Sequence, residues 1–381
     1  MKNKSYEVNL REFAGSMGDL GTLFPIALGY LAINGLNPSG FLVMLGIVNI
    51  ITGLVYKIPL PIQPMKILAA TAISQQWAPS MIYASGFAMG IVWLLITLTG
   101  LMKWIVKVTP MAVIRGIQVA LGISLALQAL PRLRTGWLLA LIAILIIVFF
   151  RQSRKAPAAV VLMGLGLTIA LVTGDWSNIQ TPGFAWPTIT AFKPKEVWDS
   201  LLLAGFAQVP LTVGNAVIAT AILIRQYWPE RTDITEHSLS LSQGIMNLVA
   251  PFFGGFPMCH GAGGLAGKYY FGARTGGTNI IEGTIEVILG LFFGGSIIAV
   301  FAAFPQAIIG AMMLLVGVEL AKFAKGAKFD KDLIPMLTTI GLALVVNMAI
   351  GFIGGLIVAQ ALKYLDPNRH KNQENEAQNQ I

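Results

Sequence analysis

The stretch that decides the fold reads Phe256-Pro257-Met258-Cys259-His260-Gly261-Ala262-Gly263-Gly264-Leu265-Ala266-Gly267-Lys268 and lies among long apolar segments. Its proline favours an extended chain, and its glycines allow close backbone approach and weaken a helix. An upstream stretch resembles it: Pro59-Leu60-Pro61-Ile62-Gln63-Pro64-Met65-Lys66-Ile67-Leu68-Ala69-Ala70. Three prolines break a helix. Each stretch therefore predicts an extended piece that leads into a short helix.

Composition indicates a membrane protein. Hydrophobic residues make up 55% of the 381 residues and charged residues only 11%, about half of the usual charged share. Apolar runs long enough to cross a bilayer recur through nearly the whole chain. The net charge of +9 does not indicate nucleic-acid binding, because the basic residues lie in short loops between apolar segments. The single Cys259 excludes an internal disulfide and a multi-cysteine metal site, so we expect neither a metal nor a cofactor.

The apolar pattern predicts an all-α polytopic membrane protein with about fourteen transmembrane segments. Segments 3 and 10 are the two broken ones, near 58–77 and 255–270. The other spans are expected near 12–33, 40–56, 80–102, 110–129, 136–150, 156–173, 197–223, 238–253, 278–302, 304–322, 332–350 and 351–364. Residues 1–11 are read as a cytosolic N-terminus, 174–196 as an extracytoplasmic loop, and 365–381 as a disordered cytosolic tail.

The positions of Lys and Arg support this topology. With the N-terminus inside, most loop lysines and arginines fall on the inner side, as the positive-inside rule expects. Only Arg132, Arg134, Lys193 and Lys195 fall outside. Both termini are then cytoplasmic, and the absence of a cleavable signal pattern and of a targeting sequence suggests a bacterial inner membrane.

A weak internal repeat divides the chain. Gly46, Asn49 and Pro59 recur 198 residues later, and Pro110, Ala112 and Gly122 recur 195 residues later; the later residues are Gly244, Asn247, Pro257, Pro305, Ala307 and Gly317. Each half, 12–173 and 197–364, then holds seven segments. Because seven is odd, the second half enters the membrane from the opposite side, which predicts a seven-plus-seven inverted repeat.

Two broken segments at matching places in two repeats indicate a transporter binding site near the midplane. A helix N-terminus offers free N–H groups and a partial positive charge to an anion. Lys66 adds a full positive charge, and Gln63 and His260 add polar donors. The residues expected around the substrate are Gln63, Met65, Lys66, Gln208, Asn215, Cys259, His260, Gly261, Ala262 and Gly263. Cys259 also fits a simple packing role.

Asp19, Glu286 and His260, all within the expected membrane segments, are candidates for carrying a coupled proton. Asp19 lies in the first span, where an ionised group is costly and needs a partner. It is expected to bond the backbone near the break, to pair with Lys66, or to carry a coupled proton. Glu286, one turn from Glu282, is the second candidate.

Both broken stretches resemble a known family. Pro59 to Ser74 and Pro257 to Gly277 are similar to hallmark sequences of the molybdate transporters of plants, algae and bacteria, a branch of the sulfate permease superfamily. The resemblance extends through Gly18 to Thr22 and Arg115 to Gln118. It implies a core domain of segments 1–4 and 8–11 that moves against a gate domain of 5–7 and 12–14. It also implies Gln63, Lys66 and His260 as residues near the substrate. Many sulfate permeases carry a cytosolic STAS domain, whereas only a short tail follows the last span expected here.

The sequence thus predicts a secondary active transporter, not an enzyme. It would import a tetrahedral oxyanion by an elevator-like alternating access, with protons as the coupling ion, and the resemblance implies molybdate as the first choice of cargo. A sulfate or general oxyanion permease, with sulfate or tungstate as cargo, stays open, as does an anion channel. No GxxxxGK[ST] motif for ATP is present. The expected partners are the substrate, membrane lipid and a second copy of the chain, because dimers are common in related folds.

Overall fold

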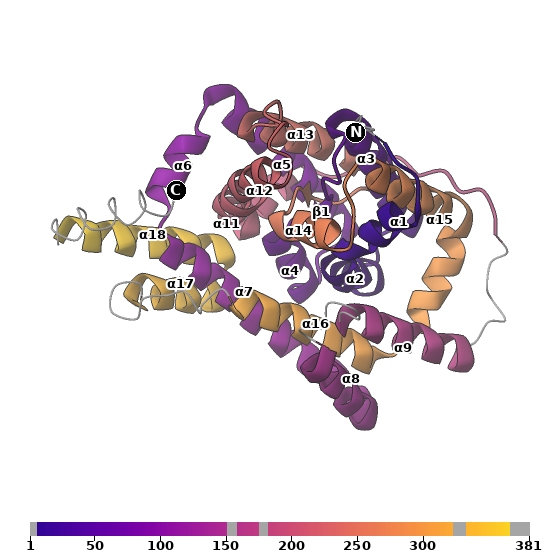
Figure 1. The fold of residues 1–381 in the computed structure, drawn as a ribbon. Helices are drawn as coiled ribbons and strands as arrows, with labels where there is room; N and C mark the ends of the chain where they lie inside the picture. The colour runs from indigo at the N-terminus through magenta and orange to yellow at the C-terminus, as the bar shows by residue number, and fades with distance from the viewer. Residues whose placement is uncertain (1–5, 151–157, 175–181, 323–332, 366–381) are drawn as a thin grey trace.

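The computed structural model describes residues 6–150, 158–174, 182–322 and 333–365. Within these ranges the fold is helical except for one pair of two-residue strands (Figure 1). The elements up to residue 173 are α1 (Leu10–Ser16), η1 (Met17–Asp19), α2 (Leu20–Leu28), η2 (Gly29–Ile33), α3 (Pro38–Tyr56), β1 (Gln63–Pro64), α4 (Lys66–Ser74), α5 (Pro79–Thr99), α6 (Met102–Val108), α7 (Met111–Leu133), η3 (Arg134–Gly136), α8 (Trp137–Phe150) and α9 (Ala158–Thr173).

The later elements follow a similar order of helix, strand and short helix. They are α10 (Pro194–Ser200), η4 (Leu201–Gly205), α11 (Phe206–Thr212), η5 (Val213–Ile218), α12 (Ala219–Tyr227), α13 (Glu236–Val249), η6 (Ala250–Phe253), β2 (Met258–Cys259), α14 (Ala262–Tyr270), α15 (Gly277–Ala302), α16 (Gln306–Ala321), α17 (Leu333–Val345) and α18 (Met348–Leu365).

The chain is an integral membrane protein by the length and composition of its helices. Among the described residues, five helical runs are long and apolar enough to cross a membrane: 38–56, 79–99, 111–150, 194–227 and 277–297. A bent pair over 10–33 would make a sixth, and four further apolar helices are shorter. The exact number of fourteen spans therefore stays a prediction.

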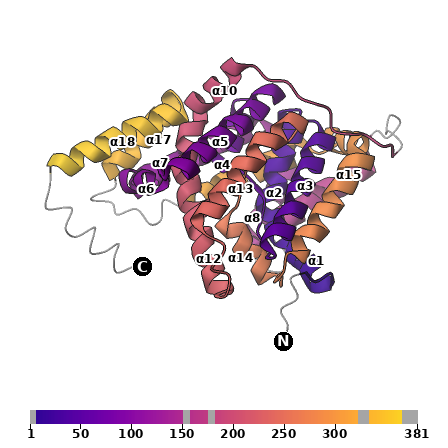
Figure 2. The same cartoon turned by 90° about the horizontal axis from the view of Figure 1, so that it is seen from above.

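The helices form two groups, seen side by side in Figures 1 and 2. In one group α3 packs along α15 and α5 along α13, around α4 and α14. Backbones approach closely there: a Cβ on Gly46 would lie 2.5 Å from Gly283 O, and one on Gly90 would lie 2.6 Å from Leu248 N. Small residues at such contacts are the usual means of packing helices in membranes.

The second group contains α7, α8, α16, α17 and α18, with α7 packed along α16 and α17. Here the two helices α7 and α16 meet at Gly122 and Gly317, where an added Cβ on either would lie 2.6 to 2.7 Å from the carbonyl of the other. Contacts of α4 with α7 and of α2 with α16 join the two groups.

The structure differs from the sequence map at the expected boundary between 110–129 and 136–150. Residues 111–150 form one helical run with Pro131 inside α7 and a single 3₁₀ turn, η3, in place of a loop. Proline removes only one backbone donor, and a tight turn keeps the chain helical. The expected disordered tail lies outside the described residues beyond Leu365.

Candidate functional site

The two interrupted stretches meet inside the first group of helices. β1 and β2 pair antiparallel, with Gln63 opposite Cys259, and Met65 donates its N–H to Pro257 O at 2.9 Å. Helices α4 and α14 begin just after the strands, so their N-termini flank the two-residue ribbon. Segments far apart in the sequence thus bring two helix N-termini to one place, as the proline and glycine pattern predicts.

Asparagine side chains hold both extended pieces. Asn247 donates to Met258 O at 2.7 Å and accepts from Met258 N at 2.8 Å. In the first half, Asn279 donates to Leu60 O at 2.5 Å and to Asn49 Oδ1 at 3.1 Å. Non-helical backbone at membrane depth needs such partners because no lipid group satisfies its N–H and C=O groups.

The N-terminus of α4 is closed by a side chain. Gln208 Oε1 accepts from Ile67 N at 2.8 Å and from Leu68 N at 3.3 Å. Its Nε2 donates to Thr212 Oγ1 at 2.5 Å, which fixes the amide orientation. Gln208 lies on α11, between the π-helical turns η4 and η5, and such turns are frequent at functional sites. The amide oxygen therefore occupies the donors that a bound anion would need.

The N-terminus of α14 is open. The N–H groups of Ala262, Gly263 and Gly264 donate no hydrogen bond to any described residue. Gly263 is exposed although its neighbours are buried, and a Cβ added there would meet no atom within 4 Å. Lys66, half-buried at the first position of α4, supplies a nearby cation. The open helix end at Gly263 is the part of this site that can accept an anion.

Asp19 and Gln63 fill the space beside this open end. Gln63 Nε2 donates to Asp19 Oδ1, and both side chains are buried. A Cβ on Gly264 would lie 2.6 Å from Gln63 Nε2 and 2.9 Å from Asp19 Oδ1. Asp19 Oδ2 and Gln63 Oε1 have no hydrogen-bond partner among the described residues. Asp19, which was expected to bond the backbone, to pair with Lys66 or to carry a coupled proton, thus bonds Gln63 in the field of the α14 N-terminus. Its role as a proton carrier stays a prediction.

Two further buried carboxylates, Glu282 and Glu286, lie on α15. Glu282 pairs with the fully buried Lys268 at 2.5 Å, and Glu286 Oε2 accepts from Asn49 Nδ2 at 2.8 Å. The charges of Lys268 and Lys66 both act on Asp19. Buried charges need such partners because desolvation is costly.

His260 joins the two halves of the ribbon. Its Nδ1 lies 3.2 Å from Pro61 O and its Nε2 lies 3.0 Å from Ser242 Oγ. Because the carbonyl only accepts, Nδ1 carries the proton, and Nε2 of the neutral ring accepts from the serine. The ring is fully buried.

The expected site residues fall into two sets by exposure. Lys66, Gly263 and Asn215 are at least partly accessible; Gln63, Met65, Gln208, Cys259, His260, Gly261 and Ala262 are buried. The buried set builds the scaffold behind the open helix end. Ser242, Lys268 and Asn279 were not predicted as site residues, and only the polarity of Lys268 inside an apolar region signalled a role.

Within the described residues, no group of three or more His, Cys, Asp or Glu side chains is placed to hold a metal ion. The arrangement offers backbone donors and a lysine to an anion.

Comparison with known proteins identifies the family. The sequence model described as "Molybdate transporter of MFS superfamily" matches residues 11–125 and 200–320, more than half of the chain. The chain belongs to the molybdate transporter family. Its relatives include Molybdate transporter 1 of Arabidopsis thaliana, 33% identical over 93% of this chain and 88% of the relative. Molybdate transporter 1 of Chlamydomonas reinhardtii is 28% identical over 92% of this chain and 91% of the relative.

Solved structures match the fold of this molybdate transporter family member. The transmembrane domain of the cyanobacterial bicarbonate transporter BicA has a TM-score of 0.66 at 19% identity, covering 92% of this chain and 99% of that one. The murine anion transporter Slc26a9 in its inward-facing state has a TM-score of 0.68 at 13% identity, covering 96% and 69%. At these identities the likeness establishes the fold alone. The relatives named above are transporters, in agreement with the prediction that the chain is not an enzyme.

Proposed function

We propose that this protein transports molybdate across a membrane and binds it at the open N-terminus of α14. The observation that carries the proposal is the exposed Gly263, whose N–H group, like those of Ala262 and Gly264, has no acceptor among the residues that the structure describes. The half-buried Lys66 adds the charge that a dianion needs. Molybdate is proposed as the substrate because the relatives are named molybdate transporters. Charge-assisted hydrogen bonds from several donors offset the desolvation of such an anion.

Transport by movement of a core against a gate is part of the proposal. The first group of helices would be the core, carrying both strands and both short helices, and the second group would be the gate. The inverted repeat is supported by residues at matching positions. Gly122 and Gly317 meet each other. Asn247 bonds one extended piece directly, whereas its counterpart Asn49 accepts from Asn279, which donates to the other piece at Leu60 O.

Proton coupling follows from the position of Asp19. An ionised Asp19 at the first turn of α14 competes with a bound dianion for the same positive potential. Two unit charges 4 Å apart repel by about 4 kcal/mol at an effective dielectric constant of 20. Protonation of Asp19 removes this repulsion, so one proton would enter with the anion. Glu286 and His260 are engaged by Asn49, Pro61 and Ser242, which makes them second choices.

The deciding experiment measures molybdate binding to the purified protein, with sulfate as the competitor. Lys66→Ala should weaken binding about 10- to 100-fold, the loss of roughly 1.5–3 kcal/mol for a hydrogen bond to a charged group. Lys195→Ala is the matched control, because that lysine is 81% exposed and, within the described ranges, its ion pair is with Asp199. If sulfate displaces molybdate freely, the protein is a general oxyanion permease. If the folded protein binds neither anion, the proposal fails.

A further inference from the structure

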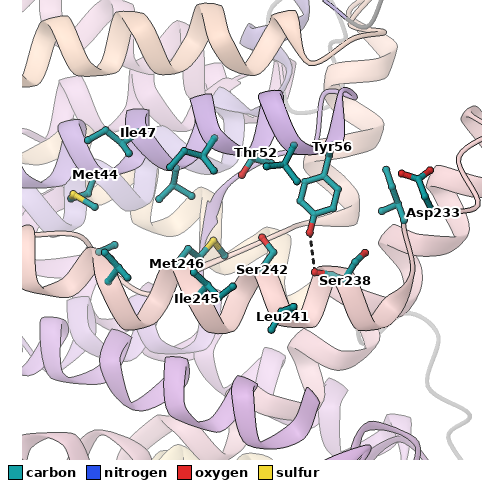
Figure 3. A pocket seen from close by; sticks show the side chains of 16 residues that line it. Met44, Ile47, Thr52, Tyr56, Asp233, Ser238, Leu241, Ser242, Ile245 and Met246 are labelled. Carbon is teal, nitrogen blue, oxygen red and sulfur yellow. Dashed lines mark hydrogen bonds between the residues drawn. The ribbon is translucent and has the colours of Figure 1, made fainter. Parts of the chain in front are cut away.

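A groove of about 530 Å³ runs between α3 and α13. Its walls extend from Met44 to Tyr56 on one helix and from Asp233 to Ala250 on the other side, as Figure 3 shows. In Figure 1, α3 and α13 lie on the side of the molecule away from α7 and α16. The groove therefore lies away from the second group of helices, and its exposed isoleucines would meet lipid in a membrane.

The chemistry of the groove changes along its length. Its inner part is apolar, and Ile51 and Ile245 on opposite walls are each 53% exposed. From Tyr56 to Met44 it follows 12 residues of helix (56 − 44), about 18 Å at 1.5 Å per residue. One leaflet of the hydrocarbon core is half of roughly 30 Å. The groove thus starts at a helix end and reaches about the depth of one leaflet.

The mouth of the groove is polar and charged. Tyr56 OH donates to Ser238 O at 2.8 Å (Figure 3). Arg231 bonds Asp233 and the Tyr56 carbonyl, and this guanidinium holds the pKa of the Asp233 carboxyl below its ordinary value of 3.8. The two groups therefore neutralise each other. The exposed Lys57 follows Tyr56 and takes part in none of the ion pairs found among the described residues.

We propose that this groove binds one membrane phospholipid, with an acyl chain between α3 and α13 and the phosphate at Lys57. An apolar slot at membrane depth that is open to lipid cannot be filled by water. Lysine at the interface is a usual partner of phosphate groups. The depth of the slot fits one acyl chain, and the exposed Lys57, which follows the lining residue Tyr56, supplies a cation for the headgroup.

This lipid lies directly behind the anion site. Ser242 lines the groove and also bonds His260 Nε2 at 3.0 Å. The ring of Tyr56, at the groove mouth, meets the His260 ring edge-on with centroids 6.0 Å apart. An acyl chain in the groove therefore packs against the residues that hold the β1–β2 ribbon.

The test places the whole protein in phosphatidylcholine vesicles that contain a phosphatidylethanolamine with a photoreactive diazirine on its acyl chain. After illumination, peptides that carry lipid are mapped by mass spectrometry. We expect the label to concentrate on residues 44–55 and 241–249. Ile245→Trp fills the groove and should reduce that label about tenfold, the equivalent of 1.4 kcal/mol. Lys57→Glu should reduce it too, because it places like charge against the phosphate.

Leu95→Trp on α5 is the matched control, because Leu95 is 54% exposed and does not line the groove. It should leave the labelling of the groove unchanged. Even labelling of all lipid-facing helices, or equal labelling of the Ile245→Trp and Leu95→Trp proteins, would overturn the proposal. Absence of label together with a dimer that Ile245→Trp dissociates would show that a second copy covers the groove. None of these readouts depends on molybdate transport, so the outcome is independent of the proposed function.

Discussion

At the scale of single residues, Gln208 shows how a side chain can make two similar helix ends unequal. Its carbonyl oxygen takes the first free N–H groups of α4, at Ile67 and Leu68, whereas α14 has no such cap among the described residues. The sequence placed Gln208 near the substrate as one of several polar groups. The side chain caps α4, which leaves one of the two expected anion-binding ends available, and its nearness to the substrate stays a prediction.

Gln208→Glu should raise the KM for molybdate uptake about tenfold while the protein still folds. A carboxylate caps the α4 N-terminus at least as well as the amide, but it adds a negative charge near the bound dianion. Initial uptake rates into vesicles at a series of molybdate concentrations measure the effect; tenfold corresponds to about 1.4 kcal/mol. Gln75→Glu, at the other end of α4 and exposed, is the control. An unchanged KM would place the substrate away from α4.

Asp19→Asn should abolish accumulation driven by a pH gradient and preserve exchange of labelled for unlabelled molybdate. The asparagine oxygen still accepts from Gln63, so the local structure is retained. The amide, unlike the carboxyl group, cannot gain and release a proton during transport. Glu286→Gln is the comparison, because that carboxylate bonds Asn49 away from the helix end. If Glu286→Gln uncouples transport and Asp19→Asn does not, the coupling group has been assigned to the wrong carboxylate.

At the scale of elements, local rules explain why the extended pieces before α4 and α14 were predictable. Pro59, Pro61 and Pro64 restrict their own backbone and remove donors within a few residues, so the break can be read from neighbours in the sequence. The cap from Gln208 and the bond from Asn279 to Leu60 join residues 141 and 219 positions apart. Contacts at such separations depend on tertiary packing, and no local pattern in a single sequence reports them.

Helix α14 offers a sharp test of the open end. Gly263→Leu should block molybdate binding but leave the thermal stability of the protein at or above its original value. Leucine is a better helix former than glycine by up to about 1 kcal/mol, and the space beside Gly263 is free of protein atoms within 4 Å. Gly164→Leu on α9 is the control, since that glycine is also exposed and unobstructed. Normal binding by folded Gly263→Leu would exclude this helix end as the anion site.

At the scale of the whole molecule, apolar composition predicted the membrane class, whereas the assignment of segments to a core and a gate stays a prediction. The continuous run of α7, η3 and α8 was not predicted, because hydropathy marks where apolar residues occur and not where a helix turns back. Arg132 and Arg134, next to Pro131, are typical of a loop between two spans. The side of the membrane on which each end lies, and the bacterial membrane itself, stay predictions from the sequence.

The energetics of import provide the last prediction. Moving a dianion into a compartment that is negative by 100 mV costs roughly 4.6 kcal/mol. Each proton that enters with the anion cancels one negative charge and so removes about 2.3 kcal/mol of this cost. An inward pH gradient adds a driving force of about 1.4 kcal/mol per proton for every pH unit. In vesicles with an inward proton gradient and an imposed potential, we expect gradient-driven accumulation of molybdate. With one proton per anion, a negative interior should slow uptake; with two, the potential should have no effect on it. Uptake that is equal with and without the pH gradient would rule out proton coupling, whatever its response to the potential.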